Sequence, residues 1–283
     1  MRINHNISSM ITQGALFQVN RGNSKTLEKL STGLRINRAS DDAAGLSISE
    51  TMRAQVRGLN MAKRNATDGI ALLQIAEGAM NEISSILQRM RELSIESAND
   101  TLTSVERTYT NQEFNALRSE IDRIVNTTLY NGQTLLDGTG FGGTGSNSCI
   151  LHIGPNYTAN RDYITIGIRT MTASQDNGLA LSARTLTDQS SALSSVGSID
   201  TALGTVNQSR SDLGAYINRL EHTVNNIINQ EHNSQAAESV IRDTDFAIET
   251  ANFTKNQILM QSATAMLAQA NLVPQSVLAL LGR

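Results

Sequence analysis

Small and apolar side chains near the C-terminal end of the chain recur at alternating intervals of four and three residues. The members of this series are Leu259, Ala263, Met266, Ala270, Val273, Val277 and Leu280. The spacing places them all on one side of an α-helix, as in the contact face of a coiled coil. Pro274 interrupts the pattern, because proline removes a backbone donor and bends a helix. Such a face needs a partner helix, either in the same chain or in another molecule.

A similar series lies near the N-terminal end and predicts a first amphipathic helix. Its members are Ile3, Ile7, Met10, Gly14 and Phe17. The pattern breaks between residues 31 and 45. Ser40 is the predicted N-cap of the next helix, with Asp41 and Asp42 in its first turn, where acidic side chains are favourable.

The longest amphipathic pattern follows and extends to Ala98. Its apolar positions are Met52, Val56, Leu59, Ala66, Ile70, Leu73, Met80, Ile83, Leu87 and Met90. A helix over residues 42–98 would be roughly 80 Å long at 1.5 Å per residue. Thr103 and Glu106 then have the spacing of a capping box, which predicts a further helix. The inner face of that helix comprises Phe114, Leu117, Ile121 and Ile124.

A short non-helical region separates these helices from the last ones. Asn131 and Gly132 predict a turn. Cys149, Leu151 and Ile153 alternate with other residues, as do Ile164, Ile166 and Ile168, and the two runs predict a β-hairpin with one apolar face. Two strands alone are only marginally stable, so the hairpin should pack against the helices.

A final long pattern is predicted to pair with the helix over 42–98. It consists of Leu203, Val206, Leu213, Ile217, Leu220, Val224 and Ile227, with Arg210 as its polar member. The chain is therefore predicted to be mainly α, a folded-back rod of long helices with coiled-coil seams and a small β-hairpin segment. The predicted segments are 1–41, 42–130, 131–189, 190–239 and 240–283.

Composition excludes several classes of protein. Hydrophobic residues make up 39% and aromatic residues 4% of the chain, which is typical of long helices packed through narrow stripes. The formal net charge of -3 leaves no basic footprint for nucleic acid. A single cysteine excludes an intramolecular disulfide. No run approaches 18 apolar residues, so no membrane span is expected. Since the first residues also lack the apolar stretch of a secretory signal, the residues alone predict a cytosolic protein.

The chain offers little for catalysis. His5, His152, His222 and His232 do not have the spacing of metal ligands. Cys149 lies on a predicted strand without a basic neighbour in sequence, which indicates a packing role. Phosphate-binding glycine loops and nucleophile motifs are lacking. We therefore expect no enzyme activity, no cofactor and no metal.

Several long segments resemble bacterial flagellins. LSTGLRINRASDDAAGLSISE (30–50), LQRMRELSIESAND (87–100) and NQEFNALRSEIDRI (111–124) resemble their N-terminal half. SRSDLGAYINRLEHTVNN (209–226), ESVIRDTDFAIETANFTKNQIL (238–259) and AMLAQANLVPQSVLALLGR (265–283) resemble their C-terminal half. The resemblance covers about 1–136 and 190–283, and flagellins differ mostly in the middle. The chain is therefore similar to a minimal flagellin with a short central region.

The resemblance implies a structural subunit that polymerises into the flagellar filament used for swimming. Its terminal helices would form the filament core and become ordered on assembly, with contacts through the two series described above. The family is exported unfolded through a type III channel, which implies a secreted protein of the extracellular flagellum rather than a cytosolic one. The implied partners are further copies, an export chaperone, and the cap and hook-junction proteins.

Many flagellins are also bound by a Toll-like receptor of the host. Arg89 and Leu93 match the receptor-binding motif, and Glu113 matches an acidic contact on the following helix. Glu96 stands where the family commonly has glutamine, and a carboxylate cannot donate a hydrogen bond.

Other functions have distinguishable consequences. A hook–filament junction protein shares the same terminal pattern, although the DDAAGLSIS and LAQAN motifs favour flagellin. A coiled-coil adaptor would form soluble dimers instead of filaments. A moonlighting enzyme would need a catalytic motif in the short central region, where none is found.

Overall fold

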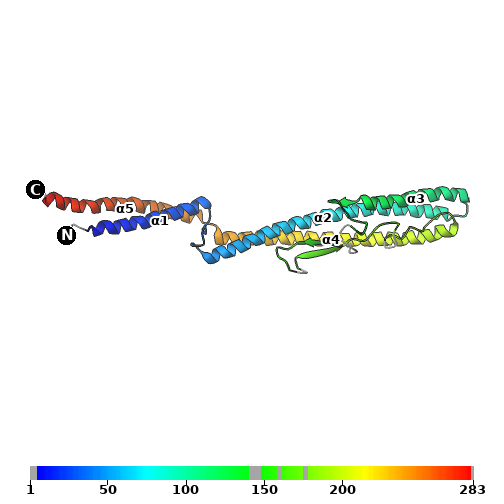
Figure 1. Ribbon diagram of the computed structural model, residues 1–283, viewed down its shortest axis with the longest axis horizontal. Coiled ribbons are helices and arrows are strands. Elements are labelled where there is room, and N and C mark those ends of the chain that lie inside the picture. Colours follow the sequence, from blue (N-terminus) through cyan, green and yellow to red (C-terminus); the bar gives the residue numbers. More distant parts are fainter. Residues whose placement is uncertain (1–4, 140–147, 159–160, 175–177, 282–283) are drawn as a thin grey trace. The chain divides into compact units, whose positions relative to one another are not determined.

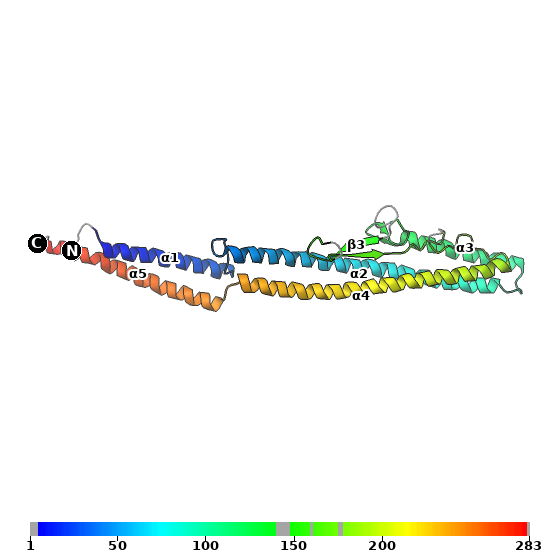
Figure 2. The ribbon, with the colours of Figure 1, turned by 90° about the horizontal axis from the view of Figure 1, so that it is seen from below.

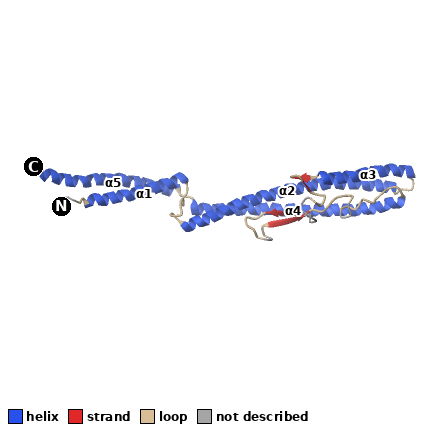
Figure 3. Cartoon of the chain, viewed as in Figure 1, coloured by secondary structure: helices blue, strands red, loops and turns tan. Residues whose placement is uncertain are grey.

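The computed structural model describes residues 5–139, 148–158, 161–174 and 178–281, and for residues 273–281 it describes the backbone alone. The described part is mainly helical, as Figures 1 and 3 show, and confirms the predicted class of long helices with a small β-hairpin segment. The helices are α1 (Ile7–Thr32), α2 (Ala43–Ser97), α3 (Ser104–Thr127), α4 (Gln189–Arg242) and α5 (Phe246–Leu281). The strands are β1 (Leu129–Tyr130), β2 (Gln133–Thr134), β3 (Ser148–His152) and β4 (Tyr163–Gly167).

The chain divides into two compact units. One unit contains residues 1–55 and 233–283, and therefore both ends of the chain, whereas the other contains residues 56–232. The second unit contains the largest hydrophobic core, where α2, α3 and α4 lie side by side in both views (Figures 1 and 2).

The long amphipathic patterns predict this core well. The buried members of the α2 pattern are Leu59, Ala66, Leu73, Met80, Ile83, Leu87 and Met90. Phe114 and Ile121 of α3 and Val206, Leu213 and Leu220 of α4 are also buried. Each helix thus buries one apolar stripe and leaves its other side to solvent, the arrangement that the 3.6-residue period predicts.

The predicted hairpin is confirmed by the antiparallel pairing of β3 with β4, in which Cys149 lies opposite Ile166 and Leu151 opposite Ile164. Gly69 of α2 permits its close approach, because a Cβ atom there would overlap the Leu151 side chain. The predicted turn at Asn131 and Gly132 joins β1 to β2, and both residues have positive φ, as a two-residue hairpin turn requires.

The beginning of α2 differs from the prediction that Ser40 is its N-cap. The helix begins at Ala43, and a carboxylate oxygen of Asp42 accepts a hydrogen bond from the Gly45 N–H at 2.9 Å. Asp42 therefore performs the capping role that we expected of Ser40. Asp41 lies before the helix and accepts hydrogen bonds from the backbone N–H groups of Asn37 and Arg38. By contrast, the capping box of Thr103 and Glu106 at the start of α3 is confirmed.

Residues 169–188 make an unexpected contribution to the core. The described residues of this segment, 169–174 and 178–188, are outside helices and strands, yet Met171, Leu181 and Leu186 are fully buried among the helices. Side chains of α3 hold this segment in place: Asp122 accepts a hydrogen bond from the Ala173 N–H at 2.8 Å, and Asn111 accepts one from the Leu186 N–H at 2.9 Å.

Candidate assembly surface

α1 and α5 form an antiparallel pair in the first unit, as both views show (Figures 1 and 2). The Asn6 side-chain amide donates to the Ala270 carbonyl at 2.9 Å near one end of the pair. Near the other end, the Lys29 ammonium lies 3.6 Å from the Glu249 carboxylate. The residues of low exposure follow the intervals of a coiled coil on both helices, so that each helix turns one narrow face towards the other.

We call these facing positions the seam. On α1 they are Ser9, Thr12, Leu16, Val19, Asn23, Thr26 and Leu30, and on α5 they are Glu249, Phe253, Asn256, Met260, Ala263, Leu267 and Ala270. About half of the seam side chains are polar. Asn256 donates to the Thr26 hydroxyl at 3.3 Å, and the buried Asn23 amide oxygen has no partner among the described residues. A polar seam fixes register but contributes little apolar burial.

The two series found in the sequence occupy different faces from the seam, except at Ala263 and Ala270. Ile7, Met10 and Phe17 are 52%, 65% and 63% exposed, and Leu259 and Met266 are 42% and 59% exposed. Ile3 and the side chains of Val273, Val277 and Leu280 lie outside the described residues. The larger described members of both series are therefore largely uncovered by the described residues of this chain.

The connections at one end of this pair are bound to each other. Leu34 forms an isolated β-bridge with Asp243, and the Arg35 guanidinium donates to the Ile241 carbonyl. Arg242 forms an ion pair with Glu50 at 2.6 Å. The connection before α2 and the connection after α4 are thus fixed to each other, which sets where α1 and α5 begin to pair.

The candidate receptor contacts lie on α2 and α3. The Arg89 guanidinium donates to Glu113 at 3.0 Å and to Glu92 at 3.1 Å, and these hydrogen bonds raise the pKa of Arg89. Both Arg89 and Glu113 are exposed. Leu93, however, is only 1% exposed and belongs to the core. Leu93 therefore cannot be a direct contact in this conformation, and its role is to pack α2.

The described residues contain no group of three or more side chains that could hold a metal ion. Cys149 is half-buried, and desolvation raises the pKa of its thiol, which disfavours the reactive thiolate. A search of the helices in the described part of the chain found none long and apolar enough to cross a membrane. The notable chemical feature of the terminal helices is thus their exposed apolar surface.

Comparison with known proteins covers both ends of the chain. Residues 3–140 match the bacterial flagellin N-terminal helical region, and residues 196–281 match the bacterial flagellin C-terminal helical region. A flagellin of Halalkalibacterium halodurans is 48% identical, with 99% of this chain and 100% of that protein covered. The flagellar filament 33 kDa core protein of Treponema phagedenis is 47% identical, with the same two coverages.

The fold has a solved relative as well. The crystal structure of Bacillus cereus flagellin matches with a TM-score of 0.50 and 30% identity, and the match covers 62% of this chain and 94% of that one.

Proposed function

Because this chain belongs to the bacterial flagellins, it is a structural subunit of the flagellar filament, and we propose that the exposed faces of its terminal helices form the core of that filament. The observation that carries this proposal is the exposure of Ile7, Met10 and Phe17 on α1 and of Leu259 and Met266 on α5. Extended apolar surface of this kind marks sites of protein association.

Further copies of the chain are the partners that best fit these faces. The α1 and α5 faces differ from each other, so a contact between them is heterologous and need not close into a ring. Heterologous contacts that do not close produce helical polymers. Ala263 and Ala270, which lie at the edge of the exposed face, are small enough to let neighbouring helices approach closely. Ile3, Val273, Val277 and Leu280 extend the same two series and are part of the proposed contact.

Assembly also offers a reason for the polar seam. Ordering the backbone costs about 1–2 kcal/mol per residue, which a narrow seam rich in Ser, Thr and Asn offsets poorly. Contacts with neighbouring subunits would supply the missing apolar burial. The paired helices of a free subunit should therefore be marginally stable, and should become fully ordered in the polymer.

We further propose that the chain is secreted unfolded through the flagellar type III channel, with an export chaperone, and that it meets the hook-junction and cap proteins at the two ends of the filament. A lone cysteine suits passage as an unfolded chain, since no disulfide must be broken. A Toll-like receptor is the remaining proposed partner. Arg89 and Glu113 are its candidate contacts, because both are exposed on neighbouring helices.

Polymerisation of the purified chain tests the core proposal. Kosmotropic salts strengthen apolar burial, so ammonium sulfate added to monomeric protein should produce long filaments visible by electron microscopy. Removal of residues 260–283 should leave a protein that stays helical in the unit 56–232 but forms no filaments. Soluble dimers of the full chain would contradict the proposal and favour a coiled-coil adaptor. Efficient filament formation by the shortened chain would show that α5 is not part of the core.

A further inference from the structure

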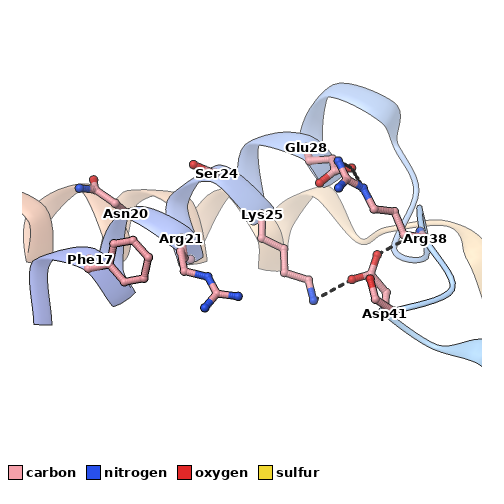
Figure 4. A pocket seen from close by; sticks show the side chains of 10 residues that line it. Phe17, Asn20, Arg21, Ser24, Lys25, Glu28, Arg38 and Asp41 are labelled. Carbon is pink, nitrogen blue, oxygen red and sulfur yellow. Dashed lines mark hydrogen bonds and ion pairs between the residues drawn. The ribbon is translucent and has the colours of Figure 1, made fainter. Parts of the chain in front are cut away.

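A groove of about 630 Å³ lies where the connection from α1 to α2 folds back along α1 (Figure 4). Phe17, Arg21, Lys25 and Glu28 of α1 line one side, and Arg38 and Asp41 of the connection line the other. We call this the basic groove, because three of these six side chains are cationic and two are anionic. It belongs to the unit of the terminal helices and is separate from the α1–α5 seam.

The charges of the basic groove are not balanced within the chain. Lys25 pairs with Asp41 at 2.8 Å, and Arg38 pairs with Glu28 at 3.0 Å. Arg21 makes no ion pair with any described residue. Its guanidinium lies 5.9 Å from the centre of the Phe17 ring and, as Figure 4 shows, extends into the open space beside α1. The groove thus presents an unpaired cation beside an exposed aromatic ring, which suits a partner that carries both a carboxylate and an apolar side chain.

The C-terminal part of α2 carries a surface with the matching properties. Ile95 is 48% exposed, and Glu92, three residues before it, is its neighbour on the helix surface. Glu96 follows Glu92 by four residues, so the two carboxylates share one side of the helix next to Ile95. Glu96 is exposed and, in the described structure, forms no ion pair. We call Glu92, Ile95 and Glu96 the acidic patch.

The charges around these two surfaces have opposite signs. Residues 1–42 contain six basic residues and three acidic ones, whereas residues 77–100 contain five acidic residues and two basic ones. Opposite potentials on two surfaces speed their encounter and fix their register. The chain therefore carries two complementary surfaces that are distinct from each other.

We propose that the basic groove of one subunit binds the acidic patch of a second subunit, with Arg21 paired to Glu96 and Phe17 packed on Ile95. This inference rests on the proposed function, because it requires the chain to polymerise. It deepens that function by naming a polar contact that sets the register between subunits, in addition to the apolar contact of the terminal helices. Since groove and patch are different surfaces, the contact leaves one of each free at the two ends of a chain of subunits.

Charge reversal tests the pairing. Arg21→Glu and Glu96→Arg should each raise the critical concentration for filament growth at low ionic strength about tenfold, which corresponds to about 1.4 kcal/mol per subunit. The control is Arg64→Glu, which reverses an exposed charge on α2 outside both surfaces and should leave the critical concentration within about twofold of wild type. Circular dichroism should show the same helix content for all variants, because Arg21, Arg64 and Glu96 are all exposed.

Two rescue experiments separate this pairing from a general loss of assembly. The double variant Arg21→Glu/Glu96→Arg should grow at close to the wild-type critical concentration. An equimolar mixture of the two single variants should also grow, because each groove then meets a patch of opposite charge when the variants alternate.

Unchanged assembly of Arg21→Glu, or a mixture that grows no better than its components, would overturn the pairing while leaving the filament function intact. A wild-type chain that forms no filaments at all would instead overturn the proposed function.

Discussion

The exposed face of α5 makes a prediction that distinguishes assembly from folding. Leu259 and Met266 are 42% and 59% exposed in the subunit, whereas Met260 and Leu267, each one position further along, face α1 in the seam. Two double variants with the same residue types can therefore be compared: Leu259→Ala/Met266→Ala removes the exposed pair, and Met260→Ala/Leu267→Ala removes the seam pair. Alanine favours helix at all four positions, so neither variant loses intrinsic helix propensity.

The size of the effect follows from the exposed fractions. Truncation of leucine or methionine to alanine removes three heavy atoms, equivalent to about 2.4 kcal/mol at about 0.8 kcal/mol per buried group. Only the exposed fraction of each side chain can become buried on assembly. The loss of assembly free energy is therefore about 1.0 kcal/mol for Leu259→Ala and about 1.4 kcal/mol for Met266→Ala. The sum of about 2.4 kcal/mol predicts a critical concentration about 50-fold higher than that of wild type.

Sedimentation of filaments measures the critical concentration, and circular dichroism of the monomer during heating measures the stability of the helices. The exposed-pair variant should assemble poorly but melt like wild type. The seam variant should lose helix content in the monomer at lower temperature. Wild-type assembly by the exposed-pair variant would refute our reasoning, as would a loss of monomer helix equal to that of the seam variant.

Four further predictions concern the unit of residues 56–232. Gly69→Ala should stabilise the protein less than Gly78→Ala in the same urea titration, because the Leu151 side chain must move away from a Cβ atom at residue 69, whereas no atom lies within 4 Å of a Cβ atom at residue 78. Thr103→Ala should cost about 1 kcal/mol through loss of the α3 cap. Hydrogen bonds from the Thr103 N–H and hydroxyl lower the pKa of Glu106. The stability that this carboxylate contributes is therefore present above its unfolded pKa and is lost as the pH falls through its folded pKa. In that acidic range, the melting temperature of Glu106→Gln should depend less on pH than that of the wild type. Arg89→Ala should weaken activation of the Toll-like receptor in a reporter-cell assay with little change in melting temperature, whereas Leu93→Ala should lower stability by about 2–5 kcal/mol. Equal melting temperatures for Leu93→Ala and Arg89→Ala would contradict the packing role of Leu93.

The core of the second unit could be predicted from sequence because each of its helices has one apolar side only. Along α2, the positions of Leu73, Met80 and Leu87 leave a single choice of buried face. The same reasoning could have placed Leu93 correctly. Leu93 follows Met90 by three residues and so continues the buried stripe, while Arg89 and Glu96 lie at the exposed edge of that stripe.

The buried face of α5 could not be chosen from sequence in the same way. Leu259 and Met260 each begin a series of alternating four- and three-residue intervals that passes through Ala263 and Ala270, the first by way of Met266 and the second by way of Leu267. Because α5 carries apolar side chains on more than one of its faces, periodicity alone does not show which face is buried. The tertiary contacts decide the choice, since Asn256 and Glu249 place the helix against Thr26 and Lys29 of α1.

The contribution of residues 169–188 escaped prediction for another reason. This segment has neither helical nor strand periodicity, and its position depends on single hydrogen bonds that backbone N–H groups donate to the side chains of Asp122 and Asn111. Such long-range contacts leave no local pattern. Met171 and Leu186 consequently read as isolated apolar residues in sequence, although they complete the core between the helices.

The distribution of side chains on the terminal helices differs from what a free-standing helix pair would need. Large apolar side chains such as Met10, Phe17 and Met266 face solvent, whereas Asn23, Thr26 and Asn256 lie in the seam. A pair built for its own stability would bury the former and expose the latter, because apolar burial is the main favourable term in folding. The polar seam instead defines how α1 and α5 align, and the apolar faces remain available to neighbouring subunits. The seam therefore determines the stability of the helix pair in the free subunit, whereas the exposed side chains determine growth of the filament.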